Sequence, residues 1–451
     1  MSILKQLASQ TAVYGMSSII GRLLNYLLVP IYTYKLADTA DYGVVTEMYA
    51  YAGFFTVLFT YGMETAYFRF AQSDNREKVF STALGSLIAS SVILTLMMLL
   101  GSGELAKLLT KDTAAVQLSA ASYRNYVTWF ALILAFDALA AIPFASLRLQ
   151  NQAARFALLK LMNIGCNMAL NLYFIVAAPW LVRNMGVAES FFVPSSAQVA
   201  YIFLSNLAAS GITFLCFVPG IFKTSWRFDS ALWKKMLAYA VPLMIVGFAG
   251  AVNEMLDRVL LKFLLPYSYE KNMAELGIYG ACYKLSILMT LFIQAYRYAA
   301  EPFFFSESKK ADAKENYAHA MRYFVIAGCI IFLGVMLYID LVKYFIAEKY
   351  HAGLRVVPVL LLANFFLGIY YNLSVWYKLT DKTMKGAYIA MGGAVITIAL
   401  NALLIPVMGY MGSAWATLIC YVFMAAVSFR MGQRHFPIPY ELGRIGFYLL
   451  L

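Results

Sequence analysis

The chain has 451 residues, of which 62% are hydrophobic and 13% are charged, and its formal net charge is +12. Apolar stretches of about 20 residues recur along the whole length, so the composition excludes an ordinary soluble protein and predicts an all-α integral membrane protein. The positive charge does not indicate nucleic-acid binding, because Lys and Arg fall in short loops between the apolar stretches rather than on one basic face.

The apolar stretches predict about twelve transmembrane helices. Their approximate ranges, in chain order, are 10–36, 43–70, 79–100, 119–146, 154–179, 197–222, 236–265, 276–305, 317–346, 353–378, 384–407 and 412–431. Lys and Arg are concentrated in alternate loops, and by the positive-inside rule this distribution predicts a cytoplasmic N-terminus. Beyond 431 the sequence becomes polar and Pro-rich, and a further apolar run then reaches Leu451. This run predicts a thirteenth helix that is truncated at the end of the sequence.

The second half of the sequence repeats the first half. The matched segments are 148–171 with 378–401, which both end in Ala-Leu-Asn, and 41–49 with 275–283. The second pair shares Gly43 with Gly277 and Tyr49 with Tyr283. A repeat of about half the chain is typical of transporters built from two related bundles. Because six helices per half is an even number, the two bundles are expected to have the same orientation in the membrane, as parallel repeats.

The helices and the repeat together divide the chain into four predicted segments. These are an N-terminal six-helix bundle (1–222), a basic cytoplasmic linker (223–235), a C-terminal six-helix bundle (236–431), and a tail with the start of a further helix (432–451). The basic linker is interpreted first as a topology signal, and binding of anionic lipid headgroups is the second interpretation.

Cations inside the predicted spans are candidates for substrate binding. A charge within a membrane costs on the order of several kcal/mol unless it faces a cavity or a partner. The candidates are Arg22, Arg69, Arg258, Lys284 and Arg297. They lie on the first two helices of each half, so equivalent helices are expected to line one central cleft. Lys284 and Arg297 would lie about 140° apart on a continuous helix and would flank a wide cavity. Such a cleft favours an anionic ligand, and a phosphate-bearing lipid suits the planar fork of Arg.

Carboxylates and amides in the spans are candidates for ion coupling. They are Asn253, Glu254, Asp257, Glu301 and Asn401. Their oxygens suit Na⁺ and their carboxylates suit H⁺, so both ions stay open. Two structural interpretations also stay open: a buried neutralising pair of Arg297 with Glu301, and interhelical hydrogen bonding by Asn401 and its repeat equivalent Asn171.

No cofactor, catalytic residue or metal site is expected from the sequence. Its five Cys and three His residues are scattered rather than grouped at ligand spacing. The sequence also has no nucleotide-binding Gly-rich loop and no clustered nucleophile and base. We therefore predict a transporter rather than an enzyme such as a polysaccharide polymerase or a glycosyltransferase.

Several blocks of the sequence resemble bacterial polysaccharide-biosynthesis membrane proteins. They are EKYHAGLRVVPVLLLANFFLGIYYNLSVWYKLTDKT (348–383), ALNALLIPVMGYMGSAWATLICYVFM (399–424), the opening SQTAVYGMSSIIGRLLNYLLVPIYTYKLADTADYG (9–43), and the Asp257-Arg258 pair before KFLLPYSY. The resemblance covers essentially the whole chain and is to the Wzx-type polysaccharide and O-antigen flippases. These belong to the multidrug/oligosaccharidyl-lipid/polysaccharide exporter (MOP) superfamily, which also contains the MATE exporters.

The resemblance implies two six-helix lobes that open alternately to the two sides of the bacterial inner membrane around a cationic cavity. The implied cargo is an undecaprenyl-diphosphate-linked oligosaccharide, with membrane lipids and other polysaccharide-assembly membrane proteins as partners. By position, Arg22 is similar to a helix 1 arginine of related lipid II flippases, and Lys284 and Arg297 fall on helix 8, which supplies cavity cations there. The chain has one arginine in helix 1 and no complete helices 13 and 14, which makes a peptidoglycan-precursor role the less favoured one.

A multidrug exporter of the same superfamily is the alternative function. A MATE-type exporter would use buried carboxylates to bind cationic drugs and would exchange them for H⁺ or Na⁺. The excess of cations among the candidate cavity residues favours the flippase instead.

Overall fold

The computed structural model describes residues 17, 19–110, 117–185, 198–308, 310, 312–380 and 382–450, and these ranges contain helices and turns but no strand. Within them, nine helices are long and apolar enough to span a membrane, and a bent pair supplies a tenth span. The predicted all-α integral membrane fold is therefore confirmed.

The helices follow one another with short connections. After a helical stretch at 19–26 they are α2 (Leu28–Lys35), α3 (Thr39–Thr60), α4 (Met63–Phe70), α5 (Arg76–Leu100), α6 (Ser102–Thr110), α7 (Gln117–Leu149), α8 (Ala153–Leu172), η2 (Tyr173–Ala177), α9 (Ala178–Met185), α10 (Gln198–Phe222), α11 (Ser230–Leu264), α12 (Tyr269–Leu285), α13 (Ile287–Glu307), α14 (Ala313–Leu337), α15 (Ile339–Val342), η5 (Lys343–Phe345), η6 (Glu348–Val356), α16 (Val357–Leu373), α17 (Val375–Leu379), α18 (Thr383–Met408), α19 (Tyr410–His435) and α20 (Leu442–Leu450).

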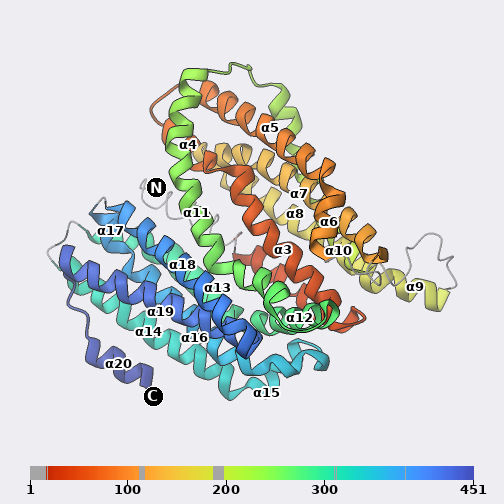
Figure 1. Cartoon of the computed structure of the whole chain (residues 1–451). Helices are drawn as coiled ribbons and strands as arrows, with labels where there is room; N and C mark the ends of the chain where they lie inside the picture. The colour runs from red at the N-terminus through yellow and green to blue at the C-terminus, as the bar shows by residue number, and fades with distance from the viewer. Residues whose placement is uncertain are drawn as a thin grey trace. The chain divides into compact units, whose positions relative to one another are not determined.

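The chain forms two compact units (Figure 1). Unit 1 comprises Met1–Ala37 and Val44–Ala251, and unit 2 comprises Asp38–Gly43 and Val252–Leu451. The change from unit 1 to unit 2 falls inside α11, because the first half of that helix packs on the N-terminal helices. The division of the chain into bundles at 222 and 236 stays a prediction.

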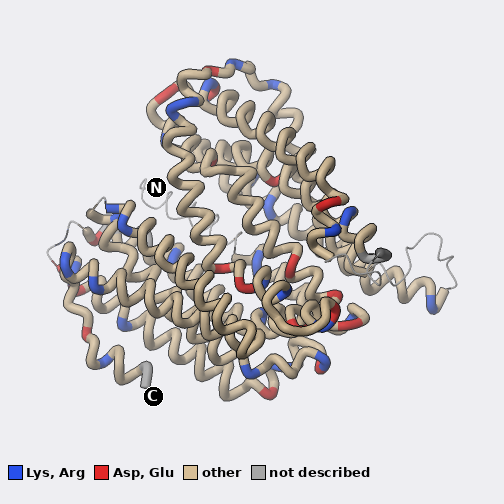
Figure 2. Tube along the Cα trace, viewed as in Figure 1, with Lys and Arg blue, Asp and Glu red and all other residues tan. Residues whose placement is uncertain are grey.

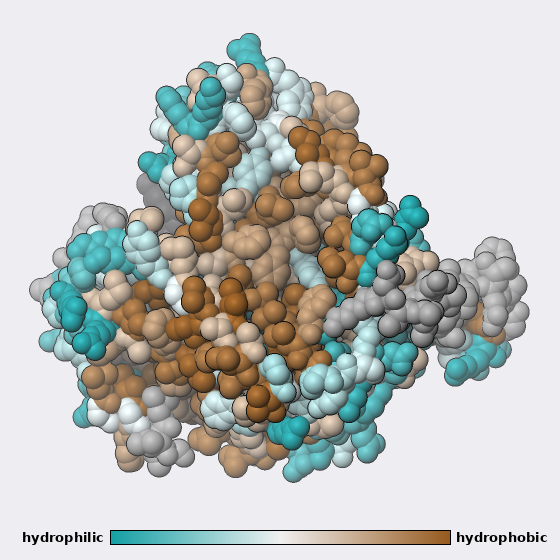
Figure 3. Space-filling model, in the orientation of Figure 1, coloured by the Kyte–Doolittle hydropathy of each residue, from teal (hydrophilic) through white to brown (hydrophobic). Residues whose placement is uncertain are grey.

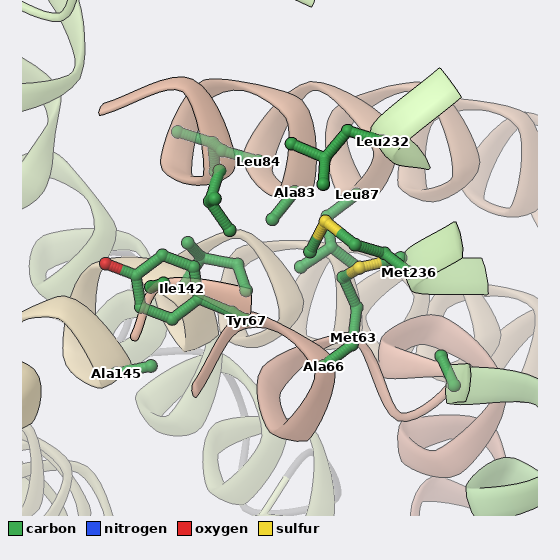
Figure 4. Close-up of a cluster of buried hydrophobic side chains, with 13 residues drawn as sticks. Met63, Ala66, Tyr67, Ala83, Leu84, Leu87, Ile142, Ala145, Leu232 and Met236 are labelled. Atoms are coloured by element: carbon green, nitrogen blue, oxygen red, sulfur yellow. The ribbon is translucent and has the colours of Figure 1, made fainter. Parts of the chain in front are cut away.

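Side chains from four helices form a core of unit 1 that has almost no exposed surface (Figure 4). The fully buried members include Met63 of α4, Leu84 of α5, Ile142 of α7 and Met236 of α11. Burial of side chains of this size stabilises the fold by roughly 1.5–3 kcal/mol each where they leave water. This core fixes the first half of α11 to α4, α5 and α7.

The outer faces of the long helices are apolar rather than charged. On α5, the exposed fractions of Ile93, Met97 and Leu100 are 58%, 64% and 87%. These residues are three or four positions apart and so form one stripe along the helix. Hydrophobic residues cover much of the visible surface along the helix flanks (Figure 3). A soluble protein rarely exposes such stripes, whereas lipid is a favourable solvent for them.

Three helices that the sequence predicts as continuous are interrupted, and their predicted continuity is wrong. The prediction 43–70 is divided into α3 and α4, and 276–305 into α12 and α13. The prediction 317–346 ends its long helix at Leu337. The prediction 353–378 lies within one span-length helix, Glu348–Leu379, which is made of η6, α16 and α17. Hydrophobicity runs through the three interruptions, so the apolar pattern alone does not reveal them.

The break between α3 and α4 depends on Gly62. This residue has φ +76°, a left-handed conformation that costs glycine little. A Cβ at this position would also lie 2.7 Å from the carbonyl oxygen of Ala240. The neighbouring Tyr61, with φ +32°, is held by a 2.6 Å hydrogen bond between its hydroxyl and Ser86 Oγ. The turn is therefore specified both by backbone conformation and by packing on α11.

The break between α12 and α13 is centred on the buried Ser286 and bends the pair by 47°. Ser286 Oγ donates to the carbonyl oxygen of Tyr283 at 2.7 Å and accepts from Asn364 Nδ2 at 3.1 Å. A serine hydroxyl that bonds to a helix carbonyl competes with the backbone ladder and favours bending. Asn364 of α16 thus supports the bend from another helix.

In unit 2, the two glycines matched by the sequence repeat meet at a close helix crossing. A Cβ on Gly277 would lie 1.8 Å from the carbonyl oxygen of Thr39, and a Cβ on Gly43 would lie 2.1 Å from that of Met273. Such distances leave no room for a side chain, so the first turn of α3 lies directly on the backbone of α12. Tyr350 adds a 3.3 Å hydrogen bond from its hydroxyl to the carbonyl oxygen of Asp38.

We expect Gly277→Ala to lower the free energy of unfolding by about 1–3 kcal/mol, because the added methyl group overpacks a backbone contact. Denaturant titration of the purified protein in detergent, followed by circular dichroism, measures the change. Gly334→Ala on α14 is the matched control, since a Cβ there meets no atom within 4 Å. An equal loss in both variants would show that the crossing is not tight.

Residues 223–229, which connect α10 to α11, are tied to α5 by an ion pair. Lys78 Nζ lies 2.5 Å from Asp229 Oδ2, and Asp229 Oδ1 accepts from the backbone N–H groups of Leu232 and Ala231. The bond from Lys78, followed by the backbone bonds, lowers the pKa of Asp229 from its usual 3.8 to about 2. This carboxylate therefore keeps its charge in mild acid, and with it the ion pair that ties the connection to α5.

We predict that the connection in wild type resists pepsin until the pH approaches about 2. The pKa of Asp229 is lower in the folded protein than in an unfolded chain. The ion pair therefore contributes its full stabilisation above about pH 4 and loses it as the pH falls through about 2. In Lys78→Gln, cleavage at 223–229 should begin about one pH unit higher. Lys107→Gln, which removes a similar pair with Glu104 on α6, should behave as wild type.

Candidate functional site

Arg258 of α11 is a largely buried cation held by a carboxylate and an aromatic ring. Its Nη1 lies 3.6 Å from Asp257 Oδ1 and donates to the carbonyl oxygen of Glu254 at 2.5 Å. The guanidinium carbon is 4.3 Å from the centroid of the Tyr283 ring. Tyr279 donates a 2.6 Å hydrogen bond to the other oxygen of Asp257. The arrangement neutralises Arg258 and fixes its direction, as expected of a buried charge.

Lys284 of α12 is a half-buried cation near this pair that has no neutralising partner among the described residues. It makes neither a hydrogen bond nor an ion pair with any residue that the structure describes. The charge of Arg258 acts on it with the same sign. A positive charge in a poorly solvated position costs free energy until an anion arrives. Lys284 is therefore suited to hold an anionic group.

Arg297 of α13 is a second candidate cation, and it lines a small cavity of about 20 Å³. Its guanidinium carbon lies 4.1 Å from the centroid of the Tyr371 ring, and Tyr296, Phe304 and Lys378 also line the cavity. Arg297 makes no ion pair within the described part of the chain. Stacking on an aromatic face leaves the N–H edges of a guanidinium available to a planar anion such as phosphate.

The structure separates the two cations of the predicted helix 8. Lys284 lies just before the break at Ser286 and Arg297 lies after it, so the 140° separation calculated for a continuous helix does not apply. Arg258 and Lys284 are brought together across α11 and α12 instead. The predicted pair of Arg297 with Glu301 stays a prediction, because the Glu301 side chain lies outside what the structure describes.

The two candidate cations of the first half are both exposed. Arg22 lies on the helical stretch at 19–26, and no partner for it is found among the described residues. Arg69 of α4 stacks on Tyr239 of α11, with its guanidinium carbon 4.3 Å from the ring centroid. Both are within unit 1, and their role in binding stays a prediction.

The two candidate asparagines for ion coupling are occupied by hydrogen bonds inside unit 2. Asn253 Nδ2 donates to the carbonyl oxygen of Ala390 at 3.1 Å, and its Oδ1 accepts from Thr397 Oγ1 at 3.2 Å. Asn401 Nδ2 donates to the carbonyl oxygen of Thr397 at 2.8 Å, and its Oδ1 accepts from Ser413 Oγ at 2.8 Å. Both amides therefore join helices, which is the geometry of interhelical hydrogen-bonding residues.

Among the carboxylates proposed for coupling, Asp257 is engaged by Arg258 and Tyr279, and Glu254 is exposed on α11. No group of three His, Cys, Asp or Glu side chains in the described ranges is placed to hold a metal ion. The third carboxylate of the prediction, Glu301, has its side chain outside the described residues, and the coupling site as a whole stays a prediction.

Sequence reasoning missed the tyrosines that orient the cations. Tyr279, Tyr283 and Tyr371 contact Asp257, Arg258 and Arg297, respectively. Two signals were present in the sequence: Tyr279 and Tyr283 are four residues apart and share a helix face, and Tyr283 matches Tyr49 in the repeat. The abundance of tyrosine, 33 residues in all, concealed them.

Comparisons with known proteins place these features in context. The family model "Polysaccharide biosynthesis protein" matches residues 7–308, which is more than half of the chain. A search of curated proteins finds no match. A solved structure of an inward-facing multidrug resistance MATE family transporter of the MOP superfamily is similar with TM-score 0.70 and 14% identity, and the match covers 95% of this chain and 96% of that one. Lipid II flippase MurJ, in an inward closed conformation, gives TM-score 0.69 and 13% identity over 97% and 90%.

We expect Asp257→Asn to lower the free energy of unfolding by about 3 kcal/mol, because it leaves the largely buried Arg258 without its counter-charge. The control is Asp340→Asn, since the Asp340 side chain is 89% exposed and pairs with Lys343 at the surface. Denaturant titration in detergent compares the two. A loss at position 257 no larger than that at position 340 would contradict the burial argument.

Proposed function

Since the chain belongs to the polysaccharide biosynthesis protein family, we propose that it is a flippase that translocates an undecaprenyl-diphosphate-linked oligosaccharide across the bacterial inner membrane. The apolar helices and the family support a multi-pass membrane protein of polysaccharide biosynthesis, and the transport role belongs to the proposal. The cargo, the inner membrane and the cytoplasmic N-terminus are parts of the proposal. The Lys-rich and Arg-rich loops support the orientation through the positive-inside rule.

The observation that carries the proposal is the presence, on the helices of unit 2, of cations for which the described residues supply no ion pair. Lys284 and Arg297 make no ion pair with the described residues, whereas Arg258 already has Asp257. A diphosphate supplies charge and several acceptor oxygens to such groups, and charge-assisted hydrogen bonds to phosphate are among the stronger ones. We propose Lys284 and Arg297 as two separate cations that the cargo contacts, and the tyrosine rings beside the arginines keep their guanidinium groups in place.

Transport by alternating access requires a source of free energy. We propose a gradient of Na⁺ or H⁺, with Glu254 and Asp257 as the carboxylates that respond to it. Asp257 is bonded to Tyr279 and adjoins Arg258, so its protonation would release the cation toward an anionic cargo. The hydrogen bonds of Asn253 and Asn401 favour a structural role for those two residues.

A cation-coupled multidrug exporter is the alternative function, and the pairing of two carboxylates, Asp257 and Glu64, weighs against it. An exporter of cationic drugs needs a carboxylate that is available to the drug. Asp257 is paired with Arg258, and Glu64 of α4 is paired with Arg148 of α7. The likeness to MATE structures concerns the fold and leaves the cargo open.

The test is translocation by the full-length protein in proteoliposomes, with a labelled undecaprenyl-diphosphate oligosaccharide and an imposed ion gradient. We expect Lys284→Ala and Arg297→Ala each to reduce the initial rate at least about tenfold, because each removes a charge-assisted contact worth about 1.5–3 kcal/mol. Lys284→Arg should retain most of the rate. Arg434→Ala, at the exposed end of α19, is the control for loss of charge and should keep the wild-type rate.

Thermal unfolding first confirms that each variant is folded. Normal rates in both Ala variants would retain the function and remove these cations from the site. Absence of translocation by wild type, combined with gradient-driven efflux of a cationic dye, would replace the flippase by the exporter.

A further inference from the structure

Unit 1 contains a pocket of about 440 Å³ at one end of its long helices. It is bounded by the start of α5, the end of α7, the start of α8 and the end of α10, together with residues 223–225. Helix ends of apolar spans lie at the membrane–water boundary, so the pocket belongs to that boundary. Its volume falls within the usual range for small-ligand pockets, about 300–1,000 Å³.

Three cations line this pocket: Arg76 of α5, Arg155 of α8, and Lys223 after α10. None of them forms an ion pair with a residue in the described ranges. Nearby cations behave differently, since Arg148 is paired with Glu64 and Lys78 with Asp229. Figure 2 shows Lys and Arg, in blue, around the start of α5 and the connection from α10 to α11. The pocket thus collects positive charge that the described residues do not neutralise.

The polar and apolar linings of the pocket are both suited to an amphipathic anion. Glu77, the acidic residue of the lining, accepts a 3.3 Å hydrogen bond from Ser225 Oγ, which holds its carboxylate. Gln150 and Thr224 add neutral hydrogen-bonding groups. Phe80 and Phe217 contribute an apolar wall. A phosphate between the cations would leave its organic substituent against that wall.

We propose that this pocket binds a phosphate ester, with Arg76, Arg155 and Lys223 as its ligands. A phosphate ester matches three cations of unlike geometry, because Arg binds two oxygens at once and Lys acts as a point charge. Basic pockets between helix ends are typical binding sites for anionic headgroups of membrane lipids. The headgroup of an anionic phospholipid and a soluble phosphate ester share this chemistry, and the experiment separates them.

The experiment measures binding to the full-length protein in detergent by native mass spectrometry and by thermal shift. In the lipid arm, phosphatidylglycerol is compared with phosphatidylcholine of the same acyl chains. In the soluble arm, glycerol 3-phosphate and inorganic phosphate are added alone. We expect phosphatidylglycerol to bind more tightly than phosphatidylcholine, and the double variant Arg76→Gln/Arg155→Gln to weaken it about 100-fold, about tenfold for each cation.

Two matched controls separate a site from general attraction to a basic surface. Lys234→Gln/Lys235→Gln removes the same charge from exposed positions of α11 that do not line the pocket, and it should change the affinity less than threefold. Gly220→Leu keeps every charge but fills the pocket, because a Cβ at Gly220 meets no atom within 4 Å. It should weaken binding as strongly as the double variant, whereas Gly334→Leu on α14 should not.

The outcomes are distinct. Selective loss in the pocket variants supports the site, with a lipid source if phosphatidylglycerol binds and a soluble source if only glycerol 3-phosphate or phosphate raises the unfolding temperature. Equal losses in the pocket and control variants, or binding of neither class, would overturn the proposal. The readout is binding rather than transport, so this result and that of the translocation test are independent.

Discussion

The constraint on which the structure depends is that backbone polar groups must be satisfied inside an apolar solvent. It explains why the described spans are helical. It also means that an interrupted helix needs other hydrogen-bond partners at its break. At the α3–α4 break, Ser86 of α5 binds the Tyr61 hydroxyl. At the α12–α13 break, Asn364 of α16 binds Ser286 Oγ. Both of these breaks are thus stabilised by a side chain from another helix, so their geometry depends on the neighbouring helices.

This dependence separates what the sequence predicts from what it does not. Apolar length alone predicts that the spans exist, and the repeat predicts that Gly43 and Gly277 are equivalent. Their meeting at one crossing explains why both positions lack a side chain. The break at Ser286 was not predictable, because its partner is 78 residues away and serine is common in continuous transmembrane helices. We infer that the Ser286 hydroxyl bends the helix because the amide of Asn364, on a second helix, hydrogen-bonds to it.

The candidate site follows the same division. The sequence shows which charged residues lie within the spans. It does not show whether each charge is paired, because the neutralising partners come from distant segments. Arg148 pairs with Glu64, which is 84 residues away in the sequence, and Asp257 accepts a hydrogen bond from the Tyr279 hydroxyl, 22 residues away. Asp257 and Arg258 are adjacent in the sequence, so their pairing needs no distant segment. Lys284 stands out only after these partners are assigned, because it is half-buried and has no partner in the described ranges, whereas Arg22, which also has none there, is exposed.

The two halves of the repeat share their structural hydrogen bonds but not their charges. Asn171 and Asn401 each donate to the carbonyl four residues earlier and accept from a hydroxyl of another helix, Tyr32 in one unit and Ser413 in the other. The aligned cations differ: Arg155 lines the pocket and has no ion pair in the described ranges, whereas its equivalent Lys385 contacts His435. Requirements common to both bundles, such as helix contacts, keep the same residues. Anion binding is needed in particular places, so the positions at which the halves differ are the ones on which the functional proposals depend.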